Sequence, residues 1–575
     1  MDNQRLLVWA GFGVLLWLTY QTWMQDYGPA PVPVTQPAET EQVTATPAEE
    51  QLALPELGET AGEPDEPGTP LPGGETADAG TPGAIITVRT DVLELQIATR
   101  GATLVRATVL GYPIEKDRPG DLVELLSPER SNLGLIRTGL RSANGAIADQ
   151  DTLFRAARSE YSLGEADELV VPLTWTDASG VSIEKRFVLA RGSYAVRVEQ
   201  TLVNNSEQPW RGDQYTQLLR RSKGMERSMF DVDSYSFDGP QTYNGDKAEK
   251  HKRDDLEDKG PVEYSTPDGW VAAIQHHFLS AIVPEPGSAH VYRVEVKGDT
   301  MIASVVGAKR TVEPGASETF SRQLFVGPKV QSQLGELHER LKLTVDYGWL
   351  TILSQPMFWL LAFIYGYVGN WGVSIILVTM LIKLVFYKMT ETSGRSMAKM
   401  RNLQPRIKAL QERYKDDRQQ LSQQMMDLYK REQVNPAAGC LPILIQMPFF
   451  LAFYWVLIES VEMRQAPFAL WITDLSTRDP YFILPLIMGA AMLLQQKLNP
   501  APADPVQARV MQIMPIMFTG FFAFFPSGLV LYWATNTVLS IAQQWKINKV
   551  VEKEEKDRKS GKKKKDKDKD KTKNK

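Results

Sequence analysis

A lysine and two hydroxyl side chains recur at even spacing along an apolar stretch of the chain. Residues 371–388 read WGVSIILVTMLIKLVFYK, in which Thr379, Lys383 and Tyr387 follow one another at intervals of four. In a helix this spacing places the three side chains on one face. A lysine within a bilayer-sized apolar segment costs about 2.5–3.5 kcal/mol on insertion scales. Lys383 therefore either snorkels to the interface or faces a wet cavity that could attract a carboxylate.

Two other apolar segments carry polar side chains that could share such a cavity. Asn536, Ser540 and Gln544 repeat the four-residue spacing, and Gln446 lies in a third apolar run. Each of these groups is costly to expose to lipid, so we expect them to converge. No acidic residue occurs within an apolar run near Lys383. We therefore expect water, rather than a salt bridge, beside the ammonium.

The apolar runs that would position these residues predict six membrane spans. The first run could be a cleaved signal peptide, but no clear cleavage site follows Tyr20, which favours an uncleaved anchor. The loop after the second span is rich in Lys and Arg, which predicts that this loop and both termini are cytoplasmic. The expected spans are 1–25 (the N-terminal anchor), 368–390, 437–460, 480–497, 509–525 and 527–545.

Between the anchor and the second span the sequence predicts a linker, a large domain and a connection. Residues 26–84 are rich in Pro and Glu without Lys or Arg, which predicts a disordered acidic linker. Short alternating runs predict an antiparallel β-sandwich over 85–327, outside the cell membrane, with a long loop at 231–258. The pair His276-His277 there lacks a third ligand at suitable spacing, so a structural role is favoured over a metal site. Residues 328–367 predict a connecting helix and an interfacial helix interrupted by Pro356.

The remaining segments are polar and basic. Residues 391–436 carry two apolar stripes around a turn at 415–417, which predicts a cytoplasmic helical hairpin, either solvated or a docking arm. Residues 546–575 are rich in lysine and are expected to be disordered, either binding RNA or anionic lipid or serving only solubility. A single cysteine, Cys440, excludes an internal disulfide. No glycine-rich phosphate loop is present.

Several of these stretches carry a resemblance. The chain resembles the YidC–Oxa–Alb family of membrane protein insertases, in its long form with a large periplasmic domain. The matching stretches are Gly369-Asn370-Trp371-Gly372, Ser396-Met397-Ala398-Lys399-Met400-Arg401, Gly439-Cys440-Leu441-Pro442 with Gln446-Met447-Pro448, Arg464-Gln465-Ala466-Pro467-Phe468-Ala469-Leu470-Trp471, and Phe525-Pro526-Ser527-Gly528-Leu529-Val530-Leu531-Tyr532.

The resemblance implies a multi-domain membrane protein: an α-helical five-span insertase core, an N-terminal anchor helix, a periplasmic all-β supersandwich and a cytoplasmic helical hairpin. It implies a hydrophilic groove open to cytoplasm and lipid, with Lys383 where the family usually has arginine, and Trp533 where tyrosine is often found. The implied substrate-groove residues are Lys383, Thr379, Tyr387, Gln446, Trp533, Asn536, Ser540 and Gln544.

The function that follows is insertion, folding and assembly of inner-membrane proteins, alone or with the Sec translocon. The expected partners are nascent membrane proteins, the Sec translocon, membrane lipids, and the ribosome through the hairpin and basic tail; a monomer is expected. No catalytic residue, cofactor or metal is expected, so the chain would not be an enzyme. A secondary transporter would predict an internal repeat, and a periplasmic sugar enzyme a paired acid and base; neither feature is found.

Overall fold

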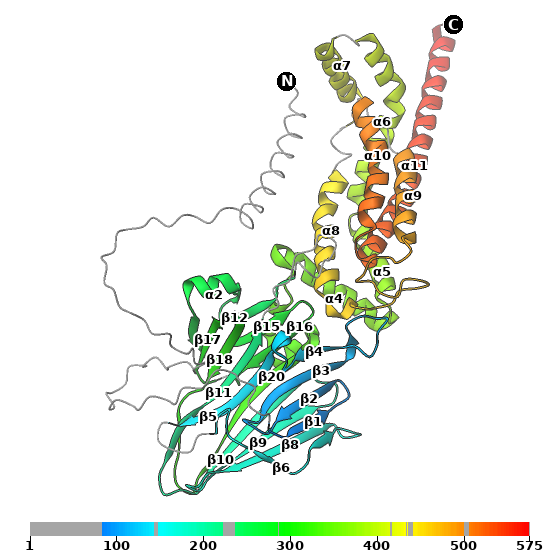
Figure 1. Ribbon diagram of the computed structural model, residues 1–575. Coiled ribbons are helices and arrows are strands. Elements are labelled where there is room, and N and C mark those ends of the chain that lie inside the picture. Colours follow the sequence, from blue (N-terminus) through cyan, green and yellow to red (C-terminus); the bar gives the residue numbers. More distant parts are fainter. Residues whose placement is uncertain are drawn as a thin grey trace, which may run out of the picture. The chain divides into compact units, whose positions relative to one another are not determined.

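The computed structural model describes residues 83–573, except 143–147, 222–235, 286, 415–416, 433, 435–440 and 499–504. The expected anchor, most of the expected acidic linker and Cys440 lie outside these residues. Apart from a short helix at Arg253–Lys259, the described chain begins with strands and continues with helices (Figure 1). This segregation is typical of separate β and α domains.

The β-rich part consists of two sheets whose inner faces are packed together. One sheet has eleven strands in the order β14-β17-β18-β11-β5-β3-β2-β1-β7, with β19 beside β11 and β4 beside β3. The other has nine, in the order β13-β12-β15-β16-β20-β10-β9-β8-β6. Every strand pair is antiparallel except β1 with β7, which is parallel. The expected extended β-sandwich is thus present, with one departure from a purely antiparallel pattern.

The strands have the following bounds. In the larger sheet they are β1 (Ile85–Arg89), β2 (Leu93–Ala98), β3 (Thr103–Pro113), β4 (Leu122–Leu126), β5 (Gly134–Ser142), β7 (Glu160–Ser162), β11 (Trp210–Arg221), β14 (Val262–Thr266), β17 (His290–Lys297), β18 (Thr300–Val306) and β19 (Arg310–Val312). In the smaller sheet they are β6 (Arg155–Ala156), β8 (Glu168–Thr176), β9 (Val181–Ala190), β10 (Ala195–Asn204), β12 (Gly239–Tyr243), β13 (Ala248–Lys250), β15 (Trp270–Gln275), β16 (Phe278–Val283) and β20 (Ser317–Pro328).

The alternation of residue types explains why these strands form a sandwich. Along β10 the side chains of Val196, Val198 and Leu202 are buried. Arg197 and Glu199 lie between them and form an ion pair on the outer face. Successive side chains of a strand point to opposite faces, so this register places one apolar face inside. Each fully buried aliphatic side chain contributes roughly 1.5–3 kcal/mol relative to exposure.

The prediction of a long loop at 231–258 is wrong for the part of this segment that the structure describes. Residues 236–258 contain β12, β13 and most of the short helix α2 (Arg253–Lys259). β12 reads GPQTY and is buried at every position, because it pairs with β15 on one side and β13 on the other. Its buried Gln241 and Thr242 make the sequence resemble a loop, although Thr242 bonds to His251 within the fold.

A connecting segment leads from β20 into the first long apolar helix. The predicted connecting helix is broken: α3 (Gln331–Leu337) ends at His338, and a 3-10 segment, Glu339–Thr344, follows. Helix α4 (Thr351–Val368) then continues through Pro356, so the proline does not interrupt it. The region Gly348–Val368 is long and apolar enough to cross a membrane by length and composition alone. Its expected interfacial placement remains a prediction.

The helical part continues with α5 to α11. The bounds are α5 (Trp371–Val385), α6 (Tyr387–Arg413), α7 (Arg418–Arg431), α8 (Leu441–Glu459), α9 (Ile483–Leu498), α10 (Pro505–Phe522) and α11 (Ser527–Lys573). Helices α5 and α6 are long and apolar enough to cross a membrane only when they are taken together. The apolar helices Leu444–Glu459 and Ile483–Leu498 are shorter. The number of six spans therefore also remains a prediction.

The structure differs from the sequence predictions at both ends of this helical part. The expected span 368–390 is not one straight helix, because α5 and α6 meet at Phe386 with a bend of 70°. The tail, expected to be disordered, is helical: α11 runs on to Lys573. Lysine and glutamate are good helix formers, so a charged composition does not by itself prevent a helix.

The polar hairpin is formed by α6 and α7. Asp417 accepts hydrogen bonds from the backbone N–H groups of Gln419 and Gln420 and so caps α7. Leu403 and Ile407 of α6 are buried. The side chains of α7 that pack against this cluster are Met425, Leu428 and Tyr429. The two predicted apolar stripes therefore meet; the cytoplasmic location of the hairpin is still a prediction.

Candidate functional site

A sharp turn between α4 and α5 sets the direction of the helix that carries Lys383. Gly369 ends α4 in the left-handed region (φ 62°), which glycine adopts without steric cost. Asn370 then caps α5, because its side-chain oxygen accepts a hydrogen bond from the Val373 N–H (3.0 Å). Its amide nitrogen donates to the Phe468 carbonyl (2.8 Å) and fixes the start of α5 to the loop after α8.

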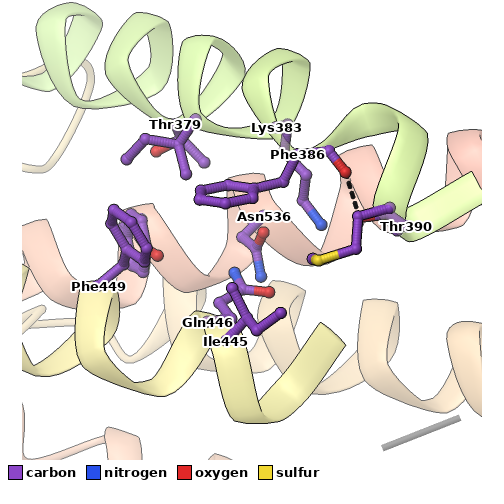
Figure 2. Close-up of a pocket in the computed structure, with 11 residues that line it drawn as sticks. Thr379, Lys383, Phe386, Thr390, Ile445, Gln446, Phe449 and Asn536 are labelled. Atoms are coloured by element: carbon purple, nitrogen blue, oxygen red, sulfur yellow. Dashed lines mark hydrogen bonds between the residues drawn. The ribbon is translucent and has the colours of Figure 1, made fainter. Parts of the chain in front are cut away.

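A cavity opens where α5, α6, α8 and α11 meet. It encloses about 420 Å³, part of it open to solvent. In Figure 2, Lys383 of α5, Gln446 of α8 and Asn536 of α11 point into the same space. Among the described residues that line the cavity, Lys383 is the one charged side chain; the lining is completed by Thr379, Ile382, Phe386, Met389, Thr390, Ile445, Phe449 and Tyr532.

The partner of Lys383 is a hydroxyl group. Its ammonium donates a hydrogen bond to Ser540 Oγ (2.7 Å), and the Ser540 hydroxyl donates to the Asn536 carbonyl (2.7 Å). The serine proton is thereby directed away from the lysine, and an oxygen lone pair faces the ammonium. The salt bridges between described residues include none at Lys383. A positive charge held by a neutral acceptor keeps its attraction for an incoming anion.

Two hydroxyl groups that line the cavity donate to backbone carbonyls four residues earlier in the chain. Thr379 is buried, and its hydroxyl donates to the Ile375 carbonyl (2.7 Å). At the bend, the Thr390 hydroxyl donates to the Phe386 carbonyl (3.0 Å), drawn as a dashed line in Figure 2. These back-bonds satisfy hydroxyl groups that would be costly inside an apolar helix bundle.

Three of the predicted groove residues lie elsewhere. Tyr387 falls beyond the bend, so it does not share a helix face with Thr379 and Lys383; its carbonyl accepts from Gln543 (3.5 Å). Trp533 packs its ring against Phe450, 4.8 Å between centroids. Gln544 bonds to Asn548 (3.0 Å) near the base of α6. The predicted stripe on the second span is therefore wrong at Tyr387, which lies beyond the bend. Gln544 stays on the unbroken helix α11 with Asn536 and Ser540, but it does not line the cavity.

The sequence predictions missed several residues that complete the cavity. Phe386, Met389 and Thr390 line it only because α6 turns away from α5 at Phe386. The ring of Phe386 meets that of Phe449 edge-to-face at 5.2 Å, which closes one wall. No Pro or Gly marks this bend, so no local signal in the sequence could have located it.

A second polar cluster lies where the β-sandwich meets the helical part. Arg464 donates to the Pro113 and Ile114 carbonyls (2.9 and 3.1 Å), and Gln465 also donates to Pro113 (2.9 Å). His276 Nε2 lies 3.0 Å from the Ile458 carbonyl. Within the described residues there is no group of three or more His, Cys, Asp and Glu side chains suited to a metal. His276 thus contacts a backbone carbonyl, and the structural role of the histidine pair remains a prediction.

Burial changes the acidity of groups in this second cluster. It raises the pKa of Glu462 to about 7, because the charged carboxylate is desolvated there. One carboxylate oxygen accepts a hydrogen bond from the Gln331 N–H (3.2 Å), while the other is shielded from solvent without a hydrogen bond. Burial likewise lowers the pKa of Lys329 to about 8. Both shifts move the pKa values of these groups toward neutrality.

Comparison with known proteins decides what kind of molecule carries this cavity. The family model described as 60Kd inner membrane protein matches residues 363–555, and that of the YidC periplasmic domain matches 85–360. The membrane protein insertase YidC of Nitrosococcus oceani is 43% identical over 96% of this chain and 100% of its own length. That of Alkalilimnicola ehrlichii is 45% identical over 98% of both chains. The chain belongs to the YidC family of membrane protein insertases.

Family membership fixes the broad architecture. A YidC protein is an inner-membrane protein with a periplasmic domain, so the β-rich part is periplasmic and the helical part is the membrane core. It is an insertase and not an enzyme. A solved structure described as "Active YidC insertase crystal structure with the first transmembrane domain resolved" covers 80% of this chain and 94% of its own, at 18% identity and a TM-score of 0.38. The assignment rests on the sequence relatives.

Proposed function

We propose that the cavity around Lys383 is the groove through which this YidC protein inserts its clients. The observation that carries the proposal is the hydrogen bond from Lys383 to Ser540, which leaves the ammonium without a carboxylate partner among the described residues. The groove receives the hydrophilic end of a nascent membrane protein, often acidic, from the cytoplasm. The client's apolar segment then moves sideways into lipid.

The groove lowers the cost of moving a charged tail across an apolar barrier. In lipid a buried charge costs several kcal/mol. Within the groove, Lys383 supplies an opposite charge, and the amides of Gln446 and Asn536 supply donors and acceptors. Water bound by these polar groups can also solvate the tail. The proposed mechanism involves no covalent step and no nucleotide. The free energy for insertion comes from binding of the client and from transfer of its apolar segment into lipid.

Substitution of Lys383 tests this mechanism. Lys383→Arg keeps the charge and is expected to keep activity. Lys383→Met removes the charge at similar volume and is expected to reduce insertion of acidic-tailed clients by about tenfold, equivalent to roughly 1.4 kcal/mol. Lys383→Glu is expected to abolish it, with partial rescue for basic tails. The measurement is insertion of matched acidic, neutral and basic-tailed clients into liposomes by equal amounts of each variant.

The control is a lysine outside the groove. Lys388 lies on α6, is exposed and does not line the cavity. Lys388→Met is therefore expected to insert all three clients like the parent protein. If Lys383→Met and Lys383→Glu also match the parent for every tail, Lys383 is only an interfacial anchor and the groove mechanism is wrong.

The partners and the orientation belong to the same proposal. The lysine- and arginine-rich hairpin supports a cytoplasmic position for α6, α7 and both termini by the positive-inside rule. We propose that the hairpin and the basic end of α11 bind the ribosome, and that the core works alone or with the Sec translocon as a monomer. Removal of residues 546–575 should weaken ribosome co-sedimentation more than insertion. The tail's contribution to binding should fall as salt rises, so the two chains should differ most at low salt. Equal co-sedimentation of both chains would exclude this role.

A further inference from the structure

Two exposed apolar residues near the start of α9 adopt strained backbone conformations. Leu470 has φ 54° and Phe482 has φ 57°, both in the left-handed region that costs a non-glycine residue roughly 1–2 kcal/mol. Leu470 is 87% exposed and Phe482 is 40% exposed. Strain of this kind persists where the surrounding structure enforces it and is common at functional sites.

A single buried carboxylate binds the chain neighbour of each strained residue. Asp479 is 1% exposed, and its Oδ1 accepts hydrogen bonds from the Trp471 indole N–H (3.1 Å) and the Tyr481 backbone N–H (3.0 Å). Trp471 follows Leu470 directly, and Tyr481 precedes Phe482. The two strained turns are therefore fastened to one oxygen atom and held close together.

Hydrogen bonds anchor the loop between α8 and α9 on the membrane core, so the exposed position of Leu470 is fixed. On either side of Leu470, the Phe468 N–H donates to the Ile472 carbonyl (3.0 Å) and Ile472 is buried. Further along, the Ser527 hydroxyl at the start of α11 donates to the Asp474 and Thr477 carbonyls (2.7 Å each). A solvated turn of this shape would favour Gly or Asn, not leucine.

The apolar surface continues from these residues onto α9. Leu486 and Ile487, one turn after Phe482, are 63% and 48% exposed. Helix α9 has 16 residues and rises about 24 Å, short of the roughly 30 Å hydrocarbon core. Leu470, Tyr481 and Phe482 extend this exposed apolar surface beyond the start of the helix.

We infer that Leu470, Tyr481 and Phe482 form a lipid-binding edge that dips into the periplasmic leaflet and lengthens the apolar face of α9. The occupant is the glycerophospholipid bilayer itself. The position of a tyrosine beside aliphatic and phenyl side chains at the end of an apolar helix suits the water–lipid interface. This contact is independent of the groove and of client insertion.

Spin labels on the full-length chain test the inference. Cys440 is first replaced by serine, and single cysteines are introduced as Leu470→Cys and Phe482→Cys in phosphatidylethanolamine–phosphatidylglycerol liposomes. Leu486→Cys gives a reference on the exposed apolar face of α9. Thr477→Cys is the matched control, since Thr477 is exposed on the same loop. Collision rates with oxygen, which partitions into lipid, are compared with those of a water-soluble nickel chelate.

Labels at 470 and 482 should favour oxygen over nickel as strongly as the label at 486, while the label at 477 favours nickel. Two results would overturn the inference. A label at 470 that behaves like the label at 477 places the turn in water. A label at 470 shielded from both reagents places it against protein, either a second copy or another partner. If Leu470→Cys does not fold, the neighbouring exposed Ala469 carries the label with the same expected outcome.

Discussion

The ammonium of Lys383 lies 2.7 Å from the hydroxyl oxygen of Ser540, on a helix 157 positions further along the chain. Because the Ser540 proton is directed to the Asn536 carbonyl, the hydroxyl can only accept from the lysine. The charge is thus fixed in position without being neutralised. An aspartate at the same place would hold the lysine more strongly, but it would cancel the attraction for a client's carboxylate.

Loss of the Ser540 hydroxyl should cost both stability and activity. Ser540→Ala leaves a partly buried ammonium without its acceptor, and a missing bond to a charged group costs about 1.5–3 kcal/mol. We expect a lower thermal unfolding midpoint and reduced insertion of acidic-tailed clients. Ser540→Thr keeps the oxygen and should behave like the parent protein. An unchanged midpoint in Ser540→Ala would show that the hydrogen bond contributes nothing measurable.

The close approach of Gly372 to Phe468 should make any side chain at position 372 damaging. A Cβ placed on Gly372 would overlap the Phe468 ring and push away the loop that Asn370 holds. We expect Gly372→Ala to destabilise the core by about 1–3 kcal/mol in unfolding measurements. Gly366→Ala is the matched control: it lies exposed in α4 with open space around it and should stabilise by up to about 1 kcal/mol. Equal midpoints for the two variants would contradict this packing.

Stability should fall as the pH rises through neutrality because of Glu462. Burial raises its pKa from 4.5 to about 7, so the folded state binds a proton that the unfolded state releases between these values. The contribution is fully present below pH 4.5 and is lost as pH rises through 7, by up to about 3 kcal/mol. Unfolding midpoints are compared at pH 6, 7 and 8. Glu462→Gln should flatten this part of the profile, and an unchanged slope would assign it to another group.

Deletion of the periplasmic sandwich should leave insertion intact only if the deletion ends after the last strand, β20. The groove residues lie wholly in the helical part, so insertion should survive loss of the sandwich. A deletion that ended near residue 300 would leave β20 without its partners β10 and β16, whereas one spanning 85–328 removes whole sheets. The clean deletion should insert clients but unfold at a lower temperature, because Arg464 and Gln465 lose their bonds to Pro113. Loss of insertion in a well-expressed chain of this kind would refute the expectation.

Much of this architecture was accessible from residue types alone. Alternating strands predicted the sandwich, and the rule that polar groups in apolar helices must converge predicted that Lys383, Gln446 and Asn536 share one space. Features that depend on contacts between residues distant in sequence could not be predicted. The bend at Phe386 is sustained by the Phe449 ring and by the bond from Gln543, both distant in sequence. The buried strand β12 was missed for a related reason: it is buried by pairing with β15 and β13, and the Gln241 amide nitrogen donates to the distant Leu343 carbonyl (3.3 Å).

The 70° bend at Phe386 closes a triangle of three rigid members. One side is α5, fastened to α11 by Lys383 and Ser540. The second is α6, fastened to α11 further along, where Ala398 packs against Ile547 and Val551 and Arg395 pairs with Glu554 (3.0 Å). The third is α11 itself between the two fastenings. A triangulated frame cannot change one angle alone. A force on the hairpin that straightens the bend must therefore be transmitted to one of the two fastenings, either the Lys383–Ser540 hydrogen bond or the contacts of Ala398 and Arg395.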